Sequence, residues 1–243
     1  MIRKIWSALP QMQLQYAHLI NDAMNRFSQE IIDFDNFEDK DLANEDSHEK
    51  TIDVLSNTLK DKEYKRFENT ALEFCITNDY IINGKGWNCV EHLLEYHDPL
   101  FTKEGSKYLK ALNNSYVSIY SVNLSKDGEC AELSNMLQEN EVATISGKKK
   151  ISELRDHKLI ATRVLKIEAK NKVIYKTSDT LLPLTKEVAE RAMHIISFIM
   201  PQMKASRGEA LTDNDILLCK KMMLKEILEQ WYLYTKSNEP VYH

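Results

Sequence analysis

The chain has 243 residues, 43% hydrophobic and 28% charged, a composition typical of a folded globular protein and unlike that of a disordered chain. With only 6 glycines and 5 prolines, it is not expected to be an all-β protein rich in tight turns. The net charge is −5, the 4 cysteines form no CxxC pair, and no apolar run is long enough to cross a membrane, so we expect a cytoplasmic protein with free thiols.

Residues 1–114 are predicted to form a helical region. Apolar residues recur at helical spacing through residues 11–32 and again through residues 52–75. Residues 33–47 interrupt this pattern with crowded acids, and we interpret them as a solvated acidic loop. Around that loop, residues 30–50 hold nine acids against two lysines. An acidic segment of this kind can remain solvated or lie against a basic one.

The second part of this helical region contains a break and two shorter helices. Asn83–Gly86 includes two glycines, which favour a turn. A short helix is predicted near residues 88–96, ending before Pro99. Thr102 is predicted to begin the next helix, which continues toward Asn114.

Residues 115–182 are predicted to form a small β module, because aromatic and β-branched residues become dense after Ser115. The pair Asp127–Gly128 is typical of a tight hairpin, and a second hairpin is expected at residues 170–172. The predicted strands are 116–124, 130–133, 142–146, 159–167 and 173–176. Short consecutive strands with close turns indicate an antiparallel meander or a partly closed barrel.

Residues 183–243 are predicted to form a C-terminal helical pair that packs on the N-terminal region. Thr185 is placed to cap the first of these helices, and Pro201 is expected to kink it. The second is expected over residues 216–234. The fold class predicted for the whole chain is therefore α+β.

Four segments of the stretch 71–167 resemble uncharacterised bacterial proteins that often end in a Cys-rich SEC-C motif. These segments are ALEF (71–74), GKGWNCVEHLL (84–94), YLKALNNSY (108–116) and LRDHKLIATRVL (154–165). The SEC-C motif itself is absent, because the cysteines are dispersed. The resemblance implies a helical platform that feeds a β module, and it implies no activity and no site residues.

The β module is strongly basic: residues 147–176 contain ten bases and three acids. Lysine and arginine neutralise phosphates and thereby provide sequence-independent affinity for nucleic acids. Tyr116, Tyr120 and Tyr175 could stack on bases. Arg163 and Lys166 belong to the same basic run, but the period of two in a strand sends them to opposite faces. The candidate nucleic-acid-binding residues are Lys148, Lys149, Lys150, Arg155 and Lys158.

The sequence predicts no catalytic residue, no metal site and no cofactor. Cys89 and His92 have the spacing of metal ligands, with His97 and Cys75 nearby. A single helix, however, does not direct Cys89, His92 and His97 at one ion, so buried structural residues are the favoured interpretation. An enzyme whose site is assembled from residues distant in sequence remains open.

The leading functional hypothesis is a non-enzymatic cytoplasmic protein-interaction or adaptor protein. Residues Ile195–Met200 are apolar around nearly the whole helix, which indicates full burial or an interface. A protein partner or a homo-oligomer is therefore expected, and no membrane is. The alternative hypothesis is nucleic-acid binding through the basic β module.

Overall fold

A computed structural model describes residues 20, 22–29, 59–82, 85–97, 102–138, 140–169, 172–207 and 213–237. The predicted acidic loop at 33–47 and the N-terminal part of the helix predicted over 52–75 lie outside these residues. The chain is an α+β protein, as the sequence predicts, with helices before and after an antiparallel sheet.

The helices and strands follow one another along the chain, and residues 20 and 22–29 before them are also helical. The elements are α4 (Asp61–Thr77), β1 (Asp79–Ile82), β2 (Lys85–Asn88), α5 (Cys89–His97), α6 (Lys103–Asn113), β3 (Val117–Leu124), β4 (Cys130–Asn135), β5 (Val142–Ser146), α7 (Lys148–Leu154), β6 (Leu159–Ala169), β7 (Lys172–Leu184), α8 (Lys186–Arg207) and α9 (Asp213–Ser237).

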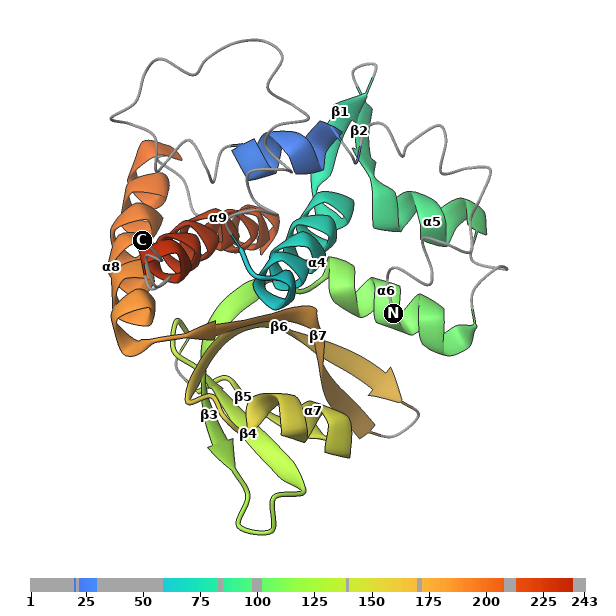
Figure 1. Cartoon of the computed structure of the whole chain (residues 1–243). Helices are drawn as coiled ribbons and strands as arrows, with labels where there is room; N and C mark the ends of the chain where they lie inside the picture. Colours follow the sequence, from blue (N-terminus) through green and yellow to red (C-terminus); the bar gives the residue numbers. More distant parts are fainter. Residues whose placement is uncertain are drawn as a thin grey trace.

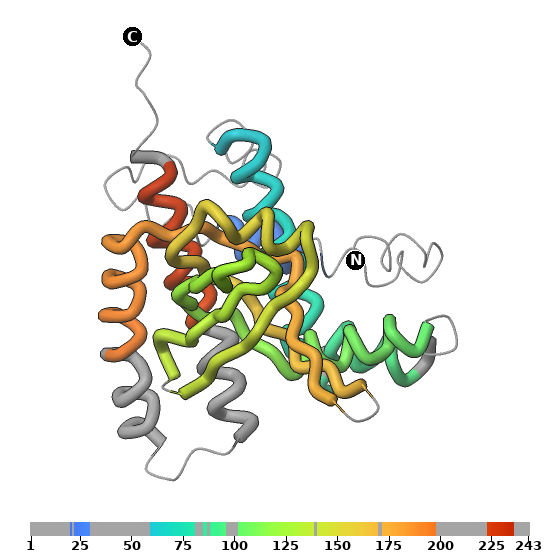
Figure 2. The backbone as a smooth tube through the Cα atoms, turned by 90° about the horizontal axis from the view of Figure 1, so that it is seen from below, coloured from blue at the N-terminus to red at the C-terminus, as the bar shows by residue number. Residues whose placement is uncertain are grey.

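The main sheet has five antiparallel strands in the order β5-β4-β3-β6-β7. The edge strands β5 and β7 approach each other without hydrogen-bonded pairing, so the sheet curls but stays open. Figure 1 shows that it curls around α7, while α4 and α9 lie on its other side. The view from below in Figure 2 shows α8 standing beside the sheet.

Each face of the sheet contributes to a separate hydrophobic core. Alternate residues of a strand point to opposite faces, so Val117 and Ile119 of β3 join the helices in the larger core. Tyr120 points the other way and joins Ile151 and Leu154 of α7 in a smaller core inside the curl. The larger core also contains Ile20, Phe67 of α4 and Trp231 of α9. One core thus unites residues from the beginning, the middle and the end of the described chain.

Several local signals in the sequence are confirmed. The predicted strand 142–146 has the observed bounds, and Gly128 in the β3–β4 turn has a φ of 69°, which glycine adopts without strain. The Thr102 side chain accepts a hydrogen bond of 3.1 Å from the Gly105 N–H. The Thr185 hydroxyl likewise accepts a bond of 3.3 Å from the Val188 N–H and caps α8.

Two local predictions are corrected. The segment predicted as a turn, Asn83–Gly86, is in part a strand: Lys85 and Gly86 belong to β2, which pairs with β1 in antiparallel fashion from Asp79 opposite Asn88, and residues 83 and 84 lie outside the described residues. In addition, the predicted β module 115–182 is not made of strands alone, because Lys148–Leu154 forms helix α7 between two of them. This helix is held by tertiary contacts, since Ile151 and Leu154 insert into the inner core. Among the described helices, none is both long and apolar enough to cross a membrane.

Candidate functional site

The five candidate nucleic-acid-binding residues lie on and just after α7, but they do not share one environment. Lys148, Lys149, Arg155 and Lys158 are exposed. Lys150 is half-buried: its ammonium is 3.0 Å from a Glu153 carboxylate oxygen and donates a 3.3 Å hydrogen bond to the Ser178 carbonyl. The structure therefore leaves four of the five side chains accessible and assigns the fifth to an internal contact.

Arg163 is not part of an exposed basic face. It is 1% exposed, on the helix-facing side of β6, and donates hydrogen bonds to the carbonyls of Leu112 and Ser115 and to the Thr77 hydroxyl. Its Nε lies 3.9 Å from the Glu73 carboxylate and has no hydrogen-bond partner. Arg163 and Lys166 therefore lie on opposite faces of β6, as the strand period predicts, with Arg163 buried and Lys166 exposed. A buried arginine is stable only when carboxylate and carbonyl oxygens surround it.

Glu73 of α4 completes this buried cluster, which joins the helices to β7. Its carboxylate accepts hydrogen bonds from the hydroxyls of Ser178 (2.7 Å) and Thr180 (2.6 Å) and from the Asp179 N–H (2.9 Å). Burial raises the pKa of Glu73 and lowers that of Arg163, while the two opposite charges stabilise each other. Neither residue lines either of the two cavities described below. We interpret the cluster as structural.

A second polar network surrounds Tyr116, between α6 and β3. Its hydroxyl lies 2.8 Å from Gln138 Oε1 and 3.1 Å from Glu141 Oε2, so it donates to one of them at a time. Asn135 donates to the same Glu141 oxygen at 2.6 Å and accepts from the buried Ser118 hydroxyl at 2.7 Å. Burial and the neighbouring Glu141 raise the pKa of Tyr116. The network fixes the chain segment between β4 and β5.

Tyr116 lines a cavity of about 380 Å³, which we call the methionine groove. Its apolar walls come from the segment after β4, from α8 and from α9: Met136, Leu137, Met193, Ile196 and Met223. The side chain of Met136 is 42% exposed at its edge. Gln138 and Ser197 add polar groups.

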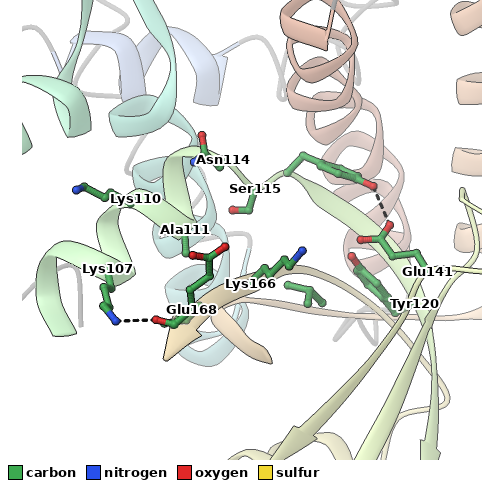
Figure 3. A pocket seen from close by; sticks show the side chains of 12 residues that line it. Lys107, Lys110, Ala111, Asn114, Ser115, Tyr120, Glu141, Lys166 and Glu168 are labelled. Carbon is green, nitrogen blue, oxygen red and sulfur yellow. Dashed lines mark hydrogen bonds between the residues drawn. The ribbon is translucent and has the colours of Figure 1, made fainter. Parts of the chain in front are cut away.

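Tyr116 also lines a cavity of about 670 Å³, which we call the lysine pocket (Figure 3). Its charged lining residues are Lys107 and Lys110 of α6, Lys166 and Glu168 of β6, and Glu141. Val164, Ile167 and Ala111 supply apolar surface. Both volumes lie within the range of small-ligand and peptide side-chain sites.

Sequence reasoning names Lys166 only as part of the basic run and does not identify this pocket. Lys107 and Lys110 were detectable as neighbours on one helix face. Their approach to Lys166 depends on α6 packing against β6, which no local pattern shows. The predicted base-stacking role of Tyr120 is wrong, because its ring is 2% exposed and belongs to the inner core.

The two cysteines among the residues with metal-ligand spacing are also internal. Cys75 and Cys89 are buried, and the side chain of His97 lies outside the described set. No group of three or more His, Cys, Asp or Glu side chains within the described ranges is arranged to hold a metal ion. Burial raises the pKa of both thiols to about 12.

Thiol labelling should distinguish these cysteines. In a Cys219→Ser background at neutral pH, we expect iodoacetamide to modify the half-buried Cys130 at least about a hundredfold faster than Cys75 or Cys89, because the buried thiols are protonated and shielded. Peptide mapping by mass spectrometry measures each rate, and all three thiols should react alike in denaturant. Labelling of Cys75 at the rate of Cys130 in the native protein would contradict this.

Comparison with known proteins gives a family without an assigned role. The model of a family described as "Family of unknown function (DUF7986)" matches residues 15–177. No curated protein matches the chain, and no solved structure matches it. The match includes the stretch 71–167 but not a SEC-C motif, so a link to SEC-C-associated proteins stays a prediction. Because the match spans more than half of the sequence, the chain belongs to this family of unknown function.

Proposed function

We propose that this chain is a non-enzymatic cytoplasmic protein-interaction protein that binds an extended segment of a partner protein in the methionine groove. The observation that carries the proposal is the groove itself: an apolar depression between helices α8 and α9 and the segment after β4. Methionine side chains adapt to different apolar partners, which suits a surface that recognises other proteins.

The rigidity of one groove wall supports this function. The Met136 N–H donates to the Ile119 carbonyl at 2.8 Å, and the Leu137 N–H donates to the Asn135 side chain at 3.0 Å. Tyr116 holds Gln138 at the end of the same segment. A wall that is already ordered loses less conformational entropy when a partner binds.

Nucleic-acid binding is retained as a second candidate because four exposed bases cluster at α7 and the turn after it. Arg66 and Lys62 of α4 lie close enough to lower the pKa of His157 in that turn, after burial as the larger cause. This surface also carries Glu153 and Asp156, which reduces its positive charge. The resemblance to SEC-C-associated proteins adds no activity to either candidate.

The proposal can be tested by panning a displayed library of random linear peptides against the full chain. We expect enrichment of peptides with large apolar side chains. A Met136→Glu substitution should lower the affinity of the enriched peptides at least about tenfold, because it places a charge where an apolar side chain of the peptide is to be buried. Fluorescence polarisation with the synthetic peptides measures the change.

Val142→Glu is the matched control, because Val142 is also an apolar side chain with comparable exposure, 46% against 42%, but does not line the groove. It should leave the affinity unchanged. A library that yields no apolar consensus, or peptides that bind the Met136→Glu protein as tightly as the wild type, would overturn the proposal. Salt-sensitive binding of a labelled oligonucleotide that is lost in Lys148→Glu/Lys149→Glu would support the second candidate instead.

A further inference from the structure

The methionine groove and the lysine pocket adjoin. Tyr116 lines both cavities, and its hydroxyl lies between Gln138 of the groove and Glu141 of the pocket. We take an extended segment that is seated in the groove and continues past Tyr116 to reach the lysine pocket, because Tyr116 lines both cavities. The lysine pocket then selects the residues that flank the apolar part of that segment.

The positive charges of the pocket lysines are not neutralised by ion pairs within the described residues. Lys110 and Lys166 are exposed and form no ion pair with any residue in the described part of the chain. Lys107 donates a 2.7 Å hydrogen bond to the Glu168 backbone carbonyl, a neutral acceptor, so its charge is not cancelled by this contact. Figure 3 shows that these lysines come from two elements, α6 and β6, and that the end of the Lys110 side chain points away from Lys166.

The two carboxylates of the pocket are not equivalent. Glu141 is engaged by the Tyr116 hydroxyl and the Asn135 amide, which partly satisfy its oxygens. Glu168 is exposed on the same strand as Lys166 and reduces the positive charge near it. The pocket is lined by three lysines and two glutamates, so its net charge is positive. It therefore attracts carboxylates more than ammonium groups.

We infer that the segment bound by this protein carries acidic residues next to its apolar anchor, with the anchor in the methionine groove and the acidic side chains in the lysine pocket. The inference rests on the proposed function and adds the chemistry of the partner. Its basis is charge complementarity with Lys107, Lys110 and Lys166. A small organic anion that occupies the pocket alone is a different occupant, which the experiment below separates.

The test uses fluorescein-labelled peptides in which a leucine–methionine pair adjoins a run of glutamates, of glutamines or of lysines, each in both orders. One of the two glutamate peptides should have the leucine–methionine pair and the glutamates in the order that fits the site. With the full chain at low salt, that peptide should bind about tenfold more tightly than the glutamine peptide of the same order. That difference should shrink as salt screens the partly exposed charges. The lysine peptide should bind most weakly.

Substitutions then assign the effect to the pocket. Lys110→Gln/Lys166→Gln should abolish the preference for glutamate and leave the glutamine peptide unaffected. Lys148→Gln/Lys149→Gln, which removes two exposed lysines elsewhere, should preserve it. Equal binding of the glutamate and glutamine peptides, or equal loss of preference in both double variants, overturns the inference.

The two proposals fail in different ways. If Met136→Glu weakens all peptides but the pocket lysines have no effect, the proposed function stands and the acidic partner is wrong. If the lysine substitutions abolish binding while Met136→Glu has no effect, the pocket binds an anion without the groove, and both the proposed function and the inferred two-part segment are wrong. If no peptide binds in either order, both proposals are wrong.

Discussion

Replacing Arg163 with methionine is expected to lower the free energy of unfolding by about 3–5 kcal/mol, because it leaves the Glu73 carboxylate buried without its cation. The substitution also removes the donors to the Leu112 and Ser115 carbonyls and to Thr77. Urea unfolding followed by circular dichroism measures the loss.

Arg155→Met is the matched control, since Arg155 is an exposed arginine of the same β module. It should change the free energy of unfolding by no more than about 0.5 kcal/mol. The double variant Glu73→Gln/Arg163→Met should recover part of the loss, because no buried charge remains and the glutamine oxygen can still accept from Ser178 or Thr180. Equal destabilisation by Arg163→Met and Arg155→Met would show that the buried cluster contributes nothing.

Leu154→Ala is expected to lower the free energy of unfolding by about 2–5 kcal/mol, which is a large effect for a residue of a seven-residue helix. Leu154 is 0% exposed and fills the inside of the curled sheet beside Ile151 and Leu133. The surrounding strands are hydrogen-bonded to one another and cannot collapse fully into the space left behind. Thermal or urea unfolding provides the measurement.

Ser152→Ala serves as the comparison for that variant, because Ser152 is exposed on the same helix. Its effect should stay within about 0.5 kcal/mol. If the two variants unfold at the same denaturant concentration, α7 is not a structural part of the inner core.

The fold class is readable from this sequence because most elements carry local signals. Thr102 and Thr185 are capping residues, and the Asp127–Gly128 pair marks the β3–β4 turn. Helix α7 is not predicted, because Gly147 before it has no side chain to cap it. In addition, the helix has only two apolar residues, three positions apart, which is too few to show a helical pattern. Its stability comes from the sheet around it, which a local pattern does not contain.

The candidate site is much less predictable than the fold. The basic run is visible as a composition, but that composition does not show that Arg163 faces inward or that Lys150 is paired with Glu153. The partner of Arg163 is Glu73, which lies in a different element far earlier in the chain. Both cavities are likewise assembled from elements separated in sequence, so their lining becomes apparent only in three dimensions. The division into three domains stays a prediction.

The end of the family match lies inside a strand. Residue 177 is in the middle of β7, and the residues just beyond it supply the groups that contact Glu73 as well as Leu181 and Leu182 of the two cores. A recombinant fragment cut at that position would expose one edge of β6 and remove the three groups that donate hydrogen bonds to the buried Glu73 carboxylate. The segment by which this family is recognised and the segment that folds as a unit therefore have different boundaries, and any excised version should extend at least through Leu184.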